Sequence, residues 1–235
     1  MVKLIRLEWK KNNIGRYIRA AVLVAAALSL FIYALAFFGI ANDPVTGVPD
    51  AAPGNEVISS SVELFTGMAF LILTGVMLSS FIVSAYKNKT MNLMFTYPIG
   101  RRRILASQML AVWIFNCGAL ILTKLLIYGC LLIGSHFMIS SFVLDFNMAD
   151  AWFYIQLILK SAVIVSMGFI ALYIGLAMHS SKAAVVASFL LILLTQANIG
   201  DFTMADSAVL PAALTAVSLI FAVLSVWNVE KKDLM

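Results

Sequence analysis

The chain has 235 residues, of which 63% are hydrophobic and only 11% are charged, and its formal net charge is +5. Soluble domains carry roughly 25% charged residues, so a soluble fold would leave too much apolar surface facing water. This composition excludes an ordinary soluble or secreted protein and favours long apolar helices covered by lipid. We expect an all-α integral membrane protein that forms a single transmembrane domain over residues 1–235.

The first segment is polar and basic. Residues 1–19 combine basic side chains with apolar anchors that include Trp9 and Tyr17. This pattern is typical of an amphipathic helix in the interface between bilayer and water, where Trp and Tyr are enriched. The alternative is a basic cytosolic tail. We expect an interfacial helix over residues 1–19, ahead of the first membrane-spanning segment.

Apolar runs long enough to span a bilayer follow. They are separated by a loop rich in Pro and Gly at residues 41–59, a basic segment at 86–103 and shorter polar links. The sequence predicts six transmembrane helices at about residues 20–40, 61–85, 105–134, 151–178, 183–198 and 208–228. On the fourth, Gly168 and Gly175 share a stripe that a neighbouring helix can approach closely.

The distribution of charge orients these helices. Of the 16 Lys and Arg, all but Lys124 and Lys160 fall in segments that are cytoplasmic when the N-terminus is cytoplasmic. The opposite loops and helix ends carry acidic residues and no basic ones: Asp43, Asp50, Glu56, Glu63, Asp145, Asp150, Asp201 and Asp206. This positive-inside pattern predicts that both termini are cytoplasmic. It also accounts for the net charge without a nucleic-acid partner.

The segment at residues 86–103 reads YKNKTMNLMFTYPIGRRR, so it carries an apolar cluster among its basic residues. The stretch 90–95 is predicted to form a short amphipathic helix. Pro98 ends it, because the residue before a proline is disfavoured in the helical region. A partner that grips such an element can move both of the flanking helices. The alternative is a solvated basic turn.

The run from Lys89 through Thr90, Leu93, Pro98 and Arg101 resembles the loop between the second and third helices of ABC transporter permeases of the second exporter type. The helix count, the amphipathic N-terminal helix and the cytoplasmic termini resemble that family as well. The resemblance implies that this loop is the coupling helix, which docks on a separate ATP-binding subunit. By that likeness, the residues that couple the chain to the ATPase are Lys89, Thr90, Met91, Leu93, Met94, Phe95, Pro98 and Arg101.

The family's smaller members include permeases for bacitracin resistance, lantibiotic immunity and the export of peptide toxins. The resemblance thus implies a subunit of a bacterial plasma-membrane exporter that pairs with a second permease, identical or different, and moves a hydrophobic or amphipathic peptide. Members often carry an acidic residue where this chain has Ala85, so a polar latch made by that residue would be missing. The alternative from another class is a membrane sensor or scaffold that performs no transport.

The chain is not expected to be an enzyme by itself. It contains no G-x-x-x-x-G-K-[ST] motif, so ATP and Mg would be bound by the partner subunit. Under the predicted topology His136 and His179 fall on opposite sides of the membrane, so they cannot share a metal within one chain. We expect no catalytic residues, no metal site and no cofactor bound by this chain.

Two lysines interrupt the apolar runs. Lys124 and Lys160 are predicted at similar depth in the outer half of the membrane, roughly 14 Å from the outer helix ends at 1.5 Å per residue. Charged side chains at such depth are costly and usually face a bundle interior or a cavity. We hypothesise that both lysines, with Glu63, line a path for an amphipathic or anionic substrate. The alternative is that they snorkel to the outer surface or pair structurally with Glu63 or Asp150.

Overall fold

The computed structural model describes residues 2–37, 57–87, 101–137, 146–178, 180–196 and 209–232. Every regular element within these ranges is a helix, which confirms the all-α class. The elements are α1 (Val2–Lys11), α2 (Gly15–Phe37), α3 (Val57–Leu78), η1 (Ser79–Val83), α4 (Ser84–Lys87), α6 (Arg101–Phe137), α7 (Ala151–Ala177), α8 (Ser181–Gln196) and α9 (Val209–Lys232). η1 is a π-helical turn that joins α3 to α4 without a break in the helix.

Four of the described segments are long and apolar enough to cross a membrane. They are Gly15–Ala36, Ile58–Val83, Arg102–Ser135 and Ala151–Ala177, from α2, α3 with η1, α6 and α7. The apolar stretches Ser181–Ile192 of α8 and Ala213–Trp227 of α9 are shorter. Large apolar side chains are exposed along these helices, as expected where the surrounding solvent is lipid. The protein is therefore membrane-embedded, with several passes.

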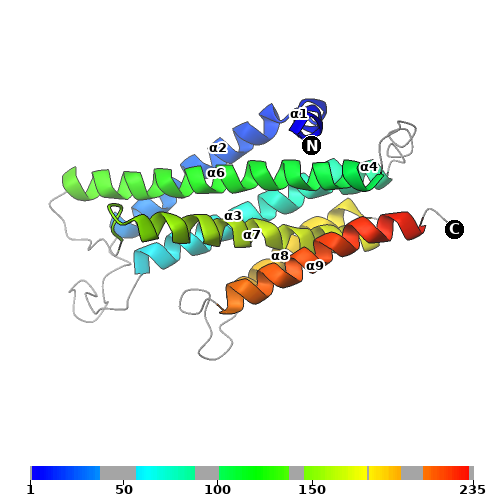
Figure 1. Cartoon of the computed structure of the whole chain (residues 1–235). Coiled ribbons are helices and arrows are strands. Elements are labelled where there is room, and N and C mark those ends of the chain that lie inside the picture. The colour runs from blue at the N-terminus through cyan, green and yellow to red at the C-terminus, as the bar shows by residue number, and fades with distance from the viewer. Residues whose placement is uncertain are drawn as a thin grey trace.

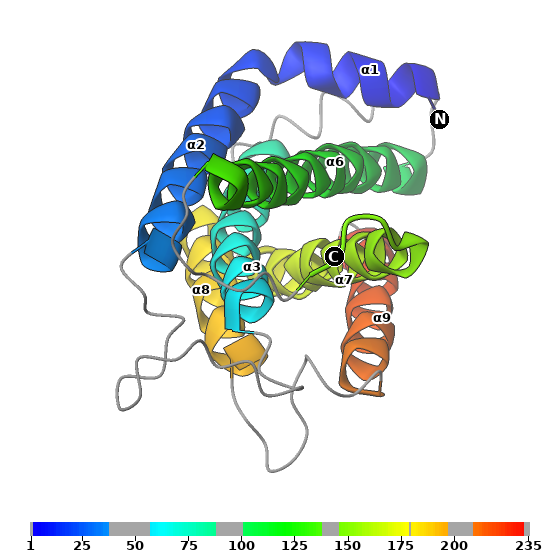
Figure 2. The same cartoon turned by 90° about the vertical axis from the view of Figure 1, so that its left-hand side faces the viewer.

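The long helices alternate in direction (Figure 1). The starts of α2, α6 and α8 and the ends of α4 and α9 lie together at one end of the bundle. Helix α1 is seen end-on in Figure 1 and lengthwise in Figure 2, so it lies across the bundle instead of along it. We call this end the basic end, after its exposed cations Lys3, Arg6, Lys10, Lys11, Arg16, Arg19, Arg102, Arg103 and Lys182.

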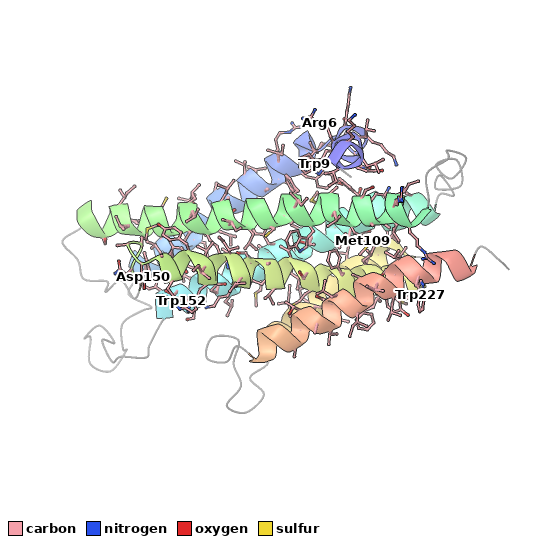
Figure 3. All side chains as sticks on the ribbon, viewed as in Figure 1. Arg6, Trp9, Met109, Asp150, Trp152 and Trp227 are labelled. Carbon is pink, nitrogen blue, oxygen red and sulfur yellow. The ribbon has the colours of Figure 1, made fainter. Side chains whose placement is uncertain are left out.

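Tryptophan side chains mark both ends of the bundle. Trp9 and Trp227 lie toward the basic end, whereas Trp152 lies beside Asp150 at the opposite end (Figure 3). Trp152 and Trp227 are well exposed. Tryptophan is enriched at both membrane–water interfaces, so their positions fit a bilayer that surrounds the middle of the bundle.

The N-terminal helix is shorter than the sequence predicts. Helix α1 ends at Lys11, and α2 already begins at Gly15, so residues 15–19 belong to the first spanning helix. Between them Asn13 has a φ of 49°, in the left-handed region that Asn tolerates better than most residues. Tyr17 faces the bundle: its ring meets Phe81 edge-on, and its hydroxyl group lies 2.8 Å from Ser80 Oγ. The expected helix over residues 1–19 is thus two helices joined by a sharp turn.

Small residues allow close contact between α7 and its neighbours. A Cβ placed on Gly175 would lie 2.6 Å from Ala184 Cβ of α8. One placed on Gly168 would lie 2.5 Å from Thr74 Cγ2 of α3. Helix α7 accordingly packs against α3 and α8, and also against α6 and α9. The predicted stripe of small residues is a packing surface.

Candidate functional site

The described part of the membrane-spanning region contains a buried ion pair. Lys124 of α6 and Glu63 of α3 meet with 2.6 Å between Nζ and Oε2. The Lys124 side chain is 0% exposed and that of Glu63 is 21% exposed. The two residues come from helices that pack directly against each other. A charge this deeply buried is tolerated only when it is paired and hydrogen-bonded, so each partner stabilises the other.

Among the described residues, the surroundings of this pair offer Lys124 few other charged or polar groups. A cluster of buried apolar side chains lies toward the end of the bundle opposite the basic end. It comes from α2, α3, α6 and α7 and includes Val62 and Ile127. The nearby hydroxyl groups of Thr66, Thr123 and Ser161 each donate a hydrogen bond to a carbonyl oxygen of their own helix. Their donor capacity is therefore used within the helices. The ion pair sits in an environment of low polarity.

Lys160 of α7 is close enough to Lys124 for the two charges to act on each other. Its side chain is half-buried, and no hydrogen bond or ion pair joins it to another described residue. Asp150, the other partner considered from the sequence, instead caps α7: its carboxylate accepts a hydrogen bond of 3.1 Å from the Trp152 backbone N–H. The structure thus pairs Glu63 with Lys124, and Lys160 acts on this pair by its charge from outside it.

A second polar cluster fixes α1 to α6. The Trp9 indole N–H donates to the Ala111 carbonyl oxygen at 3.1 Å. One turn away, the Gln108 side chain donates to Glu8 Oε1 at 3.2 Å, and the Asn12 side chain lies 3.4 Å from Glu8 Oε2. Glu8 is only 6% exposed. These contacts attach α1 to the bundle. A helix held at the membrane interface by lipid alone would have no such contacts.

Sequence reasoning missed Glu8 and Gln108. The only signal for Glu8 was a single acidic residue in an otherwise basic helix, and positive-inside arguments give such a residue little weight. Asn116, also missed, donates to the Val112 carbonyl oxygen at 3.1 Å and to Met77 Sδ at 3.3 Å, which ties α6 to α3. The hydrogen-bond partner of a neutral amide side chain in an apolar segment cannot be predicted from the sequence alone.

Most of the predicted coupling residues lie outside the described residues. These are Lys89, Thr90, Met91, Leu93, Met94, Phe95 and Pro98. Arg101 is the first residue of α6, so the helix begins earlier than the expected start near residue 105. The segment 88–100 connects α4 to α6, and both helices reach the basic end (Figure 1). Its role in coupling stays a prediction.

In the part of the chain that the structure describes, no group of three or more metal-ligating side chains comes together. His136 lies in α6, but its side chain is outside the described set, as is all of His179. Fold and site together define a membrane-embedded helical protein with a charged cluster inside its bundle.

The chain is similar to the uncharacterized protein YcbO of Bacillus subtilis (strain 168), with 24% identity over 238 aligned positions that cover 99% of this chain and 100% of the relative. No family model matches the chain, and no solved structure does either. The similarity extends over both chains, and the relative's name states no activity.

Proposed function

We propose that this chain is the membrane-spanning permease subunit of an ATP-driven exporter of the ABC class. In this proposal α8 and α9 complete six membrane passes, and the basic end lies in the cytoplasm of a bacterial cell. Two features support this orientation. The exposed cations gather at the basic end, as the positive-inside rule requires. Helix α1 and the end of α9 also lie at that end (Figure 1), as an even number of passes requires.

The observation that carries the proposal is the attachment of α1 to α6. Gln108 and Ala111, which hold α1, lie about two to three turns after Arg101, where α6 begins. The segment 88–100, with its resemblance to a coupling helix, immediately precedes Arg101 and follows α4. A force applied to this segment therefore acts on α3, on α6 and, through the Glu8 and Trp9 contacts, on α1. That arrangement suits a membrane subunit driven from its cytoplasmic side.

In the proposed mechanism a partner subunit binds ATP and Mg and performs the hydrolysis. Its movement shifts the coupling segment, and the connected helices change the access of a central path between two permease subunits. The transported molecule is a hydrophobic or amphipathic peptide, such as a toxin or an antimicrobial. Lys124, Lys160 and Glu63 are the residues that we assign to the substrate path.

The test is co-isolation from native membranes in mild detergent, followed by an assay of ATP hydrolysis. We expect a stoichiometric ATP-binding partner that is lost when Leu93→Asp and Phe95→Asp are introduced together. Asn92→Asp is the matched control, because it adds a negative charge to the same segment without removing an apolar contact; it should retain the partner. A chain that purifies alone, without ATPase activity, would contradict the exporter proposal and favour the sensor or scaffold.

A further inference from the structure

Among the described residues, the charges of the cluster formed by Glu63, Lys124 and Lys160 do not balance. Glu63 contributes one negative charge, which is committed to Lys124 at 2.6 Å. Lys160 adds a second positive charge within electrostatic range of Lys124. Helices α6 and α7 contain no acidic residue, and Glu63 is the only one in α3. The three side chains therefore carry a net charge of one positive unit in surroundings where uncompensated charge is costly.

Lys160 lies at the border between the buried and lipid-facing sides of α7. Leu157 and Ser161, its neighbours on one side, are 2% and 0% exposed. Ile158 and Leu159, on the other side, are 50% and 59% exposed. A molecule within the bilayer can thus approach Lys160 sideways, with an apolar chain along α7 and a polar head toward the ion pair.

We infer that Lys160, together with the Lys124–Glu63 pair, binds the anionic head of an amphiphile: a carboxylate or phosphate carried on an apolar chain. The anion neutralises the excess charge and accepts hydrogen bonds from the Lys160 ammonium group, which are stronger than bonds between neutral groups. Glu63 keeps Lys124 in place and sets the net charge that attracts a single anion. This inference rests on the proposed function only in naming the amphiphile as the substrate, since binding needs no ATPase.

The experiment measures binding to the full chain in nanodiscs of zwitterionic lipid. The probe is a fluorescent fatty acid, and the matched fatty alcohol, which has the same chain without the charge, is the reference. We expect the fatty acid to bind the wild type about tenfold more tightly, as a charge-assisted hydrogen bond provides. Equal binding of acid and alcohol by the wild type would overturn the inference, whatever the behaviour of any variant.

Variants then assign the effect to Lys160. Lys160→Gln is expected to remove the preference for the acid, and Lys160→Arg to retain it. Lys182→Gln, which removes an exposed cation at the basic end, is the matched control and should bind like the wild type. A preference that survives in Lys160→Gln would place the anion elsewhere and contradict the assignment.

A further arm distinguishes the source of the anion. Addition of phosphatidylglycerol to the nanodiscs should weaken binding of the fatty acid to the wild type if a lipid headgroup phosphate occupies the site, and should have no effect if the site accepts only single-chain amphiphiles. Either result supports an anion site at Lys160. Loss of co-isolated ATPase has no bearing on these measurements, so the inference and the exporter proposal fail separately.

Discussion

Removal of either partner of the buried ion pair should destabilise the protein, and Glu63→Gln should cost more than Lys124→Met. At 2.6 Å between Nζ and Oε2, the attraction is about 6 kcal/mol in an effective dielectric constant of roughly 20, and it offsets the desolvation of both groups. Loss of one partner from a buried pair typically costs about 3–5 kcal/mol. The two single variants should differ in the free energy of unfolding that they lose. Lys160 repels the Lys124 that remains in Glu63→Gln, whereas it attracts the Glu63 that remains in Lys124→Met.

Glu63→Gln leaves Lys124, whose side chain is 0% exposed, beside Lys160 without a counter-charge. We expect the upper end of the range, about 5 kcal/mol. Lys124→Met instead leaves Glu63, which is 21% exposed and can attract Lys160, so we expect about 3 kcal/mol or less. The double variant has neither charge and should return to within about 1 kcal/mol of the wild type.

The assay is equilibrium unfolding in mixed micelles with increasing SDS, followed by the fluorescence of the 4 tryptophans. The free energy of unfolding of the four proteins gives the coupling energy of the pair as a double-mutant cycle. The reasoning would be refuted if Lys124→Met were as destabilising as Glu63→Gln. It would also be refuted if the double variant were no more stable than the single ones.

Two further predictions concern contacts between helices. Gly175→Ala should lower the free energy of unfolding by about 1–3 kcal/mol, since the added methyl group meets Ala184 at 2.6 Å. Gly118→Ala is the control, because apart from its own helix backbone no atom lies within 4 Å of the added Cβ. It should be neutral or stabilising by up to about 1 kcal/mol in the same SDS titration. Equal losses would contradict the close approach of α7 and α8. Trp9→Phe should cost about 1 kcal/mol through the lost bond to the Ala111 carbonyl oxygen, and it should speed proteolysis of the N-terminal segment. Unchanged protease resistance would show that other contacts hold α1.

The approximate positions of the four long apolar helices among the described residues could be predicted because a helix that crosses lipid needs about 20 consecutive apolar residues. The predicted helix at residues 151–178 is α7, Ala151–Ala177. The first helix was predicted to begin after Arg19, yet α2 begins at Gly15. Charged residues were assumed to end a span, whereas a helix continues beyond the bilayer and long side chains such as Arg16 and Arg19 reach polar surroundings.

The candidate site could be predicted only in part. Glu63, Lys124 and Lys160 were identifiable because charges in apolar runs are rare. Which lysine pairs with Glu63 depends on how α3 and α6 are rotated about their axes, and periodicity does not give that rotation when nearly every side of a helix is apolar. The contact between Glu8 and Gln108 joins residues 100 positions apart, and only the folded arrangement of α1 across α6 brings them together.

The π-helical turn η1 has a consequence for how this protein can evolve. A π-helical turn bonds residues five apart where an α-helical turn bonds residues four apart. The spanning segment Ile58–Val83 has 26 residues, which exceeds the roughly 20 needed to cross the bilayer. Loss of one residue from Ser79–Val83 would convert the π-helical turn into an α-helical turn, so the span would stay intact and α3 and α4 would keep nearly their present register. A deletion of one codon within η1 can therefore be tolerated, whereas the same deletion within α3 would rotate everything beyond it by about 100°.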